Sequence, residues 1–265
     1  MPPLYFYQSG ILSIKTNNRT ENFSIFVFND HESMSSEVAD YFVKLHNEKK
    51  ERCYIIPGGT TPECFYSRLA EEQLDWSKTT LILSDERLVE VRNPLSNAGL
   101  IQKKFIGLIK SKVKPYLTAI YHEGMTPEQM CITFSKILND DLFDKRPDLA
   151  ILGLGDDGHT ASLFPGDYRI VEKNFDDYCV MIKNDRENFF RLSLTFNCLF
   201  LAKEILFIIS GIEKAEALSN CLNGEYNPIK WPAQYVLRNY EQQVNIFCDK
   251  SAADSIINNH KIIKA

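Results

Sequence analysis

Short apolar segments with strand character alternate with helix-like segments along most of the chain. The first pair is the β-branched and aromatic run FSIFVF at residues 23–28, followed by a segment with an acidic start and a basic end at residues 30–50. The same order recurs at 54–56 and 62–74, 80–84 and 96–104, 148–152, 178–182, 191–195 with a helix to 203, 205–209 and 213–222, and 244–248 with a final helix. This alternation predicts an α/β fold in which helices cover both faces of a mainly parallel sheet.

Nothing in the sequence divides this pattern into separate units. One further helix, over residues 126–139, begins with a capping box in which Thr126 offers a hydroxyl, Pro127 takes the first position and Gln129 follows. The sequence has no Pro/Ser/Gly-rich linker, low-complexity tract or fixed-period repeat. We therefore expect one α/β domain over residues 23–265, preceded by an extension or added edge strand at residues 1–22.

The composition is that of an average globular protein. Hydrophobic residues make up 44% and charged residues 25% of the 265 residues, and no apolar run approaches the length that spans a bilayer. The opening segment lacks the basic end, apolar middle and small-residue cleavage site of a secretory signal. We therefore expect a cytoplasmic protein without a membrane partner.

Charge and cysteine usage narrow the classes of partner. The net charge is −5 and charges of both signs are mixed throughout, so no basic stripe is available to bind a nucleic acid. The seven cysteines include no C-x-x-C pair, which suits reduced thiols. Four of them lie in apolar segments and are interpreted as small buried residues without a chemical role: Cys53, Cys179, Cys198 and Cys248.

Ligands of open parallel sheets bind beyond the carboxyl ends of the strands, so the loops that follow strands are the first places to search. The first such loop is GGTT at residues 58–61, between the strand at 54–56 and a helix that opens at Pro62. Glycines admit a close ligand, and unpaired N–H groups at a helix start favour an anion such as phosphate. A plain tight turn is the alternative. The chain contains no G-x-x-x-x-G-K-[ST] nucleotide loop.

The second loop begins with Asp85, Glu86 and Arg87 at the end of an apolar strand. Three charged residues at this place can form a solvated rim, or they can belong to a site. The guanidinium of Arg87 is suited to an anionic sugar group held near the glycine pair. Ser96 and Asn97 have the residue types that cap the next helix.

The third loop contains Gly153, Gly155 and Gly158 in the G-x-G-x-x-G spacing of dinucleotide sites. Two features disagree with a dinucleotide. Pro165-Gly166 cuts short the helix that should face the pyrophosphate, and no acidic residue ends a second strand about 20 residues onward. An oxidoreductase is therefore the weaker interpretation.

His159 follows these glycines directly and is the candidate chemical group. An imidazole takes and returns a proton near neutral pH, whereas most single histidines are structural. Asp157 can orient the ring or, alternatively, cap the turn. We expect no metal, because the other histidines are dispersed at His31, His46, His122 and His260. No G-x-S-x-G elbow occurs, and Ser162 is interpreted as a helix-start hydroxyl.

Taken together, these segments resemble the 6-phosphogluconolactonase family, within a superfamily that also contains glucosamine-6-phosphate deaminase. The resemblance covers most of the chain. Its motifs are GGTTP at 58–62, DER at 85–87 with Ser96-Asn97, LGLGDDGHTASLFPG at 152–166, RLSLT at 191–195, GIEKAEAL at 211–218 and WPA at 231–233. The long central motif is highly specific, and the others are modest individually.

The resemblance implies a three-layer αβα, Rossmann-like fold and hydrolysis of 6-phospho-D-glucono-1,5-lactone in the oxidative pentose phosphate pathway, without a metal or organic cofactor. His159 would draw a proton from water and return it to the ring oxygen. The catalytic residues implied are His159, Asp157 and Asp85. The substrate- and phosphate-binding residues implied are Gly58, Gly59, Thr60, Arg87, Asn97, Arg191 and Lys214. The partner implied is a small sugar-phosphate lactone, and we expect a monomer or weak homo-oligomer.

The motifs also leave alternatives. Without the resemblance, Arg191 at a strand start and Lys214 at a helix start would be interpreted as solvated side chains. Pro57 and Glu90 depart from the family pattern, which often has serine and proline at these places. A deaminase of the superfamily would carry glutamate where Phe164 stands, and a non-catalytic sugar-phosphate sensor would have lost the acid–base residue.

Overall fold

The computed structural model describes residues 4–8, 11–15, 23–48, 50–143, 146–171, 177–183 and 188–259. In this part of the chain the main sheet has nine strands, in the order β1-β2-β3-β12-β11-β8-β4-β5-β7. Their bounds are β1 (Leu4–Gln8), β2 (Ile11–Lys15), β3 (Phe23–Phe28), β12 (Val244–Asp249), β11 (Ile205–Ile209), β8 (Leu149–Leu152), β4 (Arg52–Ile56), β5 (Thr79–Leu83) and β7 (Tyr116–Leu117). From β3 to β7 the neighbouring strands are parallel, as the strand–helix alternation predicts.

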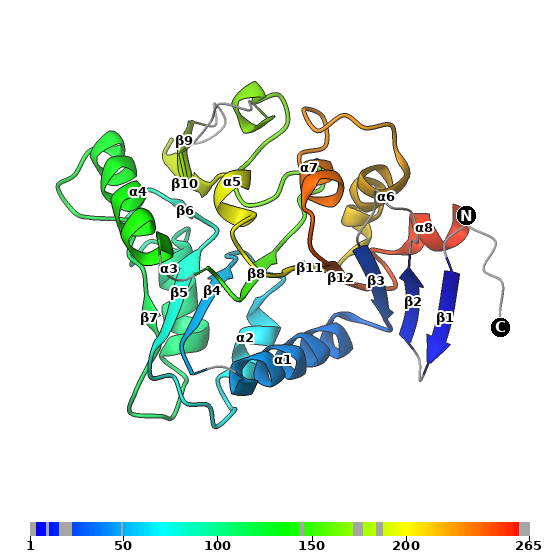
Figure 1. Cartoon of the computed structure of the whole chain (residues 1–265), viewed down its shortest axis with the longest axis horizontal. Helices are drawn as coiled ribbons and strands as arrows, with labels where there is room; N and C mark the ends of the chain where they lie inside the picture. Colours follow the sequence, from blue (N-terminus) through cyan, green and yellow to red (C-terminus); the bar gives the residue numbers. More distant parts are fainter. Residues whose placement is uncertain are drawn as a thin grey trace.

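The N-terminal segment contributes to one edge of this sheet. Strands β1 and β2 pair antiparallel with each other, and β2 pairs antiparallel with β3. Figure 1 shows them beside β3, at the end of the sheet opposite β5 and β7. Residues 1–3, 9–10 and 16–22 of the same segment lie outside the described residues.

Helices cover both faces of the sheet. The helices are α1 (His31–Glu48), α2 (Glu63–Leu69), α3 (Asn97–Ile101), α4 (Pro127–Phe143), α5 (Phe196–Leu199), α6 (Ala215–Asn223), α7 (Ala233–Asn239) and α8 (Asp254–Asn259). In Figure 1, α1 and α2 lie below the sheet, and α5, α6 and α7 lie above it. Every residue of β4, β8 and β11 is buried, which explains why these strands are apolar apart from Arg52, the first residue of β4. The fold is therefore the predicted three-layer α/β arrangement.

The local signals at helix ends are confirmed, whereas some lengths differ. The Thr126 hydroxyl accepts a hydrogen bond from the Gln129 N–H at 3.3 Å, and the Gln129 side chain accepts from the Thr126 N–H at 2.9 Å. Helix α2 ends at Leu69 instead of residue 74. The helix expected at 96–104 is a short α3 that continues as the π-helix η1 (Gln102–Ile106). None of the described helices is both long and apolar enough to cross a membrane.

Two predicted strands do not join the parallel sheet. Strands β9 (Cys179–Lys183) and β10 (Phe190–Leu194) form a second, antiparallel sheet together with β6 (Asp85–Arg87), in the order β6-β10-β9. The physical reason is the short connection from β9 to β10, because a parallel pair needs a crossover of a dozen or more residues. This sheet places Arg191 directly opposite Arg87. It therefore brings two cations from distant parts of the chain to one place.

Candidate active site

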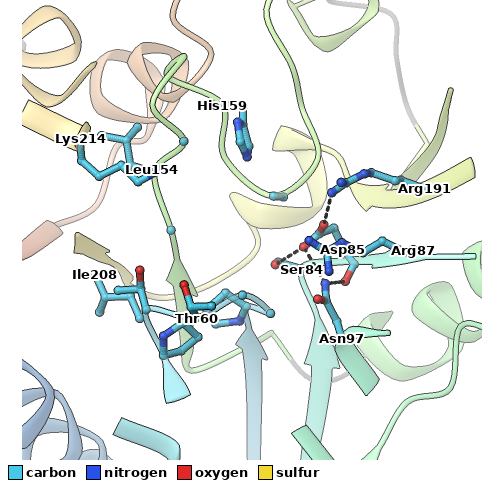
Figure 2. Close-up of a pocket in the computed structure, with 18 of the residues that line it drawn as sticks. Thr60, Ser84, Asp85, Arg87, Asn97, Leu154, His159, Arg191, Ile208 and Lys214 are labelled. Atoms are coloured by element: carbon cyan, nitrogen blue, oxygen red, sulfur yellow. Dashed lines mark hydrogen bonds and ion pairs between the residues drawn. The ribbon is translucent and has the colours of Figure 1, made fainter. Parts of the chain in front are cut away.

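A cavity of about 240 Å³ lies at the carboxyl ends of strands β4, β5, β8 and β11. It is lined by residues from the loops that follow these strands, from β10, and from η3 (Ile212–Lys214). Nine of the residues predicted for the site line it: Gly58, Gly59, Thr60, Asp85, Arg87, Asn97, His159, Arg191 and Lys214. Figure 2 shows His159 above this space, with Lys214 on one side and Asp85 and Arg191 on the other. The loops predicted from separate strands therefore meet around one cavity.

Asp157 is the tenth predicted residue, and it supports His159 from outside the cavity lining. One carboxylate oxygen, Oδ1, lies 2.6 Å from His159 Nδ1 and accepts the His159 backbone N–H at 3.0 Å. Burial alone would raise the pKa of the Asp157 carboxyl, but the hydrogen bonds and charge of His159 outweigh burial and lower it. An ionised Asp157 favours the tautomer with a proton on Nδ1, which leaves the lone pair on Nε2. The arrangement therefore leaves Nε2 as the ring nitrogen that does not face Asp157.

Two glycines of this loop are required by close contacts within the protein, without a dinucleotide. A Cβ atom on Gly155 would lie 2.0 Å from His159 Nδ1 and 2.7 Å from Asp157 Oδ1. Gly158 has a φ of +82°, and a Cβ there would lie 2.6 Å from the Trp231 ring. After them, Thr160 and Leu163 form an isolated β-bridge instead of the helix that a pyrophosphate would require. Gly155 therefore makes room for the Asp157–His159 pair, and Gly158 makes room for Trp231.

The paired glycines after β4 approach the loop after β5. Gly59 has a φ of +87°, a backbone conformation that favours glycine, and open space surrounds its Cα. A Cβ on Gly58 would lie 2.0 Å from the Asn97 side chain. Gly58 and Asn97 therefore touch across the floor of the cavity.

Asp85 lies at the centre of a buried network. Its Oδ2 accepts a hydrogen bond from the Ser162 hydroxyl at 2.5 Å and lies 3.9 Å from Arg191 Nη1. Its backbone carbonyl accepts from Asn97 Nδ2 at 2.9 Å, and Figure 2 shows Asp85 between Arg191 and Asn97. The interpretation of Ser162 as a helix-start hydroxyl is wrong, because its hydroxyl joins the His159 loop to Asp85. No signal in the sequence identified that contact between residues 77 positions apart.

Glu86, unlike the adjacent Arg87, does not line the cavity and instead stabilises the local structure. Glu86 is fully buried, and its carboxylate accepts hydrogen bonds from the backbone N–H groups of Arg87, Asn97 and Ala98 and from the Ser96 hydroxyl. Burial raises the pKa of Glu86, against the lowering effect of these hydrogen bonds. Glu86 thus anchors the start of α3, where Ser96 also caps Gly99 N–H at 3.0 Å.

Two buried polar atoms at the cavity have no hydrogen-bond partner among the described residues. They are Arg87 Nε, a donor, and Asn97 Oδ1, an acceptor. Arg87 Nη1 donates to the Leu95 carbonyl at 2.8 Å, which holds the guanidinium at the edge of the cavity. Because buried polar atoms are nearly always paired in folded proteins, this unpaired donor and acceptor indicate a polar ligand.

The solvated interpretation is wrong for Arg191. Only 11% of its side chain is exposed, and its guanidinium lies 5.3 Å from the centre of the Phe164 ring. The other neighbour of Phe164 is His159, at 4.6 Å between ring centres. The sequence did not identify Phe164 as a contact of both groups, because that contact depends on the path of the loop.

Lys214 is half-buried at the end of η3 and is positioned through a turn. Its backbone N–H donates to the Gly211 carbonyl at 3.1 Å, and Gly211 has a φ of +105°. The carboxylate of Asp249, at the end of β12, accepts from the Gly211 N–H at 3.3 Å and from the Ser210 hydroxyl. Asp249 was not among the residues predicted for the site, although its place at the carboxyl end of a strand was a usable signal.

Comparison with known proteins places the chain in a family. A model of the family described as glucosamine-6-phosphate isomerases/6-phosphogluconolactonase matches residues 29–246. A 6-phosphogluconolactonase of Pseudomonas putida is 31% identical over 197 residues, which cover 72% of this chain and 78% of that protein.

Solved structures give the same result for the fold. A 6-phosphogluconolactonase structure from Thermotoga maritima is 27% identical, with a TM-score of 0.70, and the match covers 85% of this chain and 99% of that one. A structure of a monomeric glucosamine-6-phosphate deaminase is 22% identical, with a TM-score of 0.72, and covers 87% and 99%. The second likeness shows the fold alone, so the two activities must be distinguished at the site. By sequence and by fold, this chain belongs to the glucosamine-6-phosphate isomerase/6-phosphogluconolactonase family.

Proposed function

We propose that this chain hydrolyses 6-phospho-D-glucono-1,5-lactone to 6-phospho-D-gluconate, a step of the oxidative pentose phosphate pathway. The observation that carries the proposal is one cavity lined both by His159, with Asp157 behind its ring, and by the glycine-pair turn, Arg191 and Lys214. A lactone is an activated ester, so water and one proton carrier suffice for its hydrolysis. The relative from Pseudomonas putida carries the name 6-phosphogluconolactonase.

His159 acts as the proton carrier in this proposal. Nε2 takes a proton from water while the water oxygen bonds to the lactone carbonyl carbon. The same nitrogen then gives that proton to the ring oxygen as the carbon–oxygen bond breaks, so the imidazole ends neutral. Asp157 holds Nδ1 and stabilises the imidazolium between the two steps. General acid–base help of this kind contributes about 10²- to 10⁴-fold in rate.

Three cations approach the substrate from two sides of the cavity, Lys214 from one and Arg87 and Arg191 from the other (Figure 2). In this proposal Arg191 and Lys214 bind the phosphate between them, together with the open backbone at Gly58, Gly59 and Thr60. The Arg87 guanidinium donates to the oxyanion that forms on the carbonyl oxygen. One preorganised donor of this kind contributes about 3 to 4 kcal/mol to the transition state.

Asp85 and Asn97 complete the proposed site from the buried side. Asp85 serves the reaction by positioning, because its carboxylate lies between the Ser162 hydroxyl and the Arg191 guanidinium. Asn97 Oδ1 is free to accept a hydrogen bond from a sugar hydroxyl. The loss of either side chain would therefore disturb binding groups more than the proton carrier.

The neighbour of the base favours the lactonase over the deaminase. The ring of Phe164 lies 4.6 Å from the His159 ring and cannot transfer a proton, whereas ring opening of an amino sugar phosphate needs a further acid–base group. The cytoplasmic location, the monomeric or weakly oligomeric state and the absence of nucleic-acid and membrane partners stay predictions.

The test measures which substrate the purified chain turns over. We expect acid release from 6-phospho-D-glucono-1,5-lactone, above its spontaneous hydrolysis, with a kcat of about 1 to 10³ s⁻¹. Unphosphorylated glucono-1,5-lactone should react with a much lower kcat/KM, because it lacks the group that Arg191 and Lys214 bind. Ammonia release from glucosamine 6-phosphate without lactone hydrolysis would contradict the proposal.

A further inference from the structure

Two cysteine sulfurs lie in contact on the side of the molecule that carries the second sheet. Cys131 is in the first half of α4, and Cys179 is the first residue of β9. Their Sγ atoms are 3.7 Å apart, although 48 positions separate them in the sequence. Neither residue lines the active-site cavity. The function proposed above makes no use of this pair.

The surroundings of the two thiols differ. Cys131 is half-exposed, whereas Cys179 is only 2% exposed. The Cys179 Sγ lies 3.1 Å from the Ser135 hydroxyl oxygen and donates to the Cys131 carbonyl at 3.6 Å. Cys131 is therefore the more exposed of the two residues, and the Cys179 sulfur is held by polar groups of α4.

The pKa values of the two thiols are shifted in opposite directions. The hydrogen bond with Cys179 lowers the pKa of the Cys131 thiol, although burial opposes this effect. The same hydrogen bond raises the pKa of Cys179, and burial raises it further. The pKa of Cys131 is thus shifted down and that of Cys179 up. A partly exposed thiol with a lowered pKa, in contact with a second cysteine, is the arrangement that oxidants attack.

We propose that Cys131 and Cys179 are an oxidation site at which a hydroperoxide closes a reversible disulfide between α4 and β9. The Cys131 thiolate attacks a peroxide oxygen, the O–O bond breaks, and a sulfenic acid and hydroxide form. The Cys179 sulfur then attacks the Cys131 sulfur, the S–O bond breaks, and the second hydroxide leaves. With the protons of both thiols, one hydrogen peroxide yields one disulfide and two water molecules.

The geometry requires only a small movement. A disulfide has an S–S length of about 2.05 Å, so the two sulfurs must approach by about 1.7 Å from their present 3.7 Å. Rotation about the two Cα–Cβ bonds changes the distance between the sulfurs. The contact between α4 and β9 is itself direct, since these elements pack against each other.

The disulfide would link α4 to β9 and so close the segment that contains the His159 loop. The segment between residues 131 and 179 contains β8 and the whole loop that carries His159. On its other side, β9 pairs with β10, where Ile182 stands opposite Arg191. Closing a segment of this length removes conformations from the unfolded chain, so we expect the oxidised protein to melt about 5 to 10 °C higher than the reduced one.

The test treats the full chain with one to five equivalents of hydrogen peroxide and maps the linked peptides by mass spectrometry without reduction. We expect a linked 131–179 peptide, the loss of two free thiols, a higher Tm, and reversal of all three by dithiothreitol. Cys131→Ser and Cys179→Ser should each lack the linked peptide and the rise in Tm. Both variants should keep wild-type lactone turnover, because neither residue lines the cavity.

Cys64→Ser is the matched control. Cys64 is also half-exposed, but no hydrogen bond joins it to another cysteine in the described part of the chain. This variant should form the 131–179 link as the wild type does. Oxidation of Cys64 with Cys131 left as a thiol would overturn the proposal. Sulfinic acid at Cys131 without any linked peptide would overturn it equally.

Discussion

At the residue scale, the proposed proton transfer depends on the space beside Gly155 in which Asp157 and His159 form their hydrogen bond. The Asp157 carboxylate and the His159 imidazole meet at 2.6 Å, and they do so across the Cα of Gly155. Gly155 also donates its N–H to the His159 carbonyl at 2.8 Å. The conformation of this short turn, rather than the identity of the histidine alone, therefore sets where Nε2 can reach.

This dependence predicts the effect of adding one methyl group. In Gly155→Ala the new Cβ would occupy the place of His159 Nδ1, so the ring must leave Asp157. We expect kcat to fall about 10²- to 10⁴-fold, the range attributed to a positioned acid–base group, with a smaller change in KM. Steady-state kinetics measure this split. Gly153→Ala is the control for the Asp157–His159 pair, since no protein atom lies within 4 Å of its Cβ position. Gly153 lines the cavity, so this variant is expected to raise KM but to keep most of kcat. An equal loss in both variants would contradict the assignment.

At the scale of a secondary-structure element, α1 shows that burial overrides a helix-end charge. A positive charge near a helix C-terminus is normally favourable, and His46 lies in the last turn of α1. The ring is nevertheless fully buried, 4.8 Å from the Trp76 ring, and Nε2 lies 2.8 Å from the Asp75 carbonyl. Burial lowers the pKa of His46, so the native state holds this ring neutral.

The consequence is a stability loss in mild acid. The unfolded chain binds a proton at His46 near pH 6.5, whereas the folded chain binds it only at lower pH. The contribution of His46 to the free energy of unfolding is therefore fully present above pH 6.5 and decreases as the pH falls. We expect this residue to lower stability between pH 7 and pH 5, by no more than the roughly 2 kcal/mol that a ring still neutral at pH 5 would lose. Chemical denaturation at both pH values measures it. His46→Gln keeps a donor for Asp75 but does not titrate, so its stability should change less over this range. An equal change would contradict the account.

At the scale of the whole molecule, the sheet decides which predictions from sequence were possible. The positions of residues 58–61, 85–87 and 153–159 were predictable together, because parallel strands end at one edge of the sheet. The conformation of residues 85–87 was not predictable: the expected loop is strand β6, because these residues pair with β10. The partners of Asp85 were not predictable. Ser162 reaches it from 77 positions away, and Arg191 reaches it through a second sheet that the strand pattern did not reveal. Patterns along the chain indicate which face of a helix or strand is buried and where the element ends. The contacts of Asp85 depend instead on how separate segments pack.

The contacts around Lys214, on the other side of the cavity, also depend on packing between segments that are distant in the sequence. Its turn is held by Asp249, which lies on the strand next to β11 in the sheet. The motif at residues 211–218 identified the lysine, but only the pairing of β11 with β12 explains what supports it. The account of the site therefore depends on the fold as much as on the motifs.

The most direct test of the account compares turnover and binding in His159→Ala. We predict that the folded variant binds 6-phosphogluconate in titration calorimetry with a Kd within about threefold of the wild type, since the phosphate-binding groups remain. Its kcat on the lactone should fall about 10²- to 10⁴-fold. A variant that binds the product normally and hydrolyses the lactone at the wild-type rate would show that this imidazole does not carry the proton.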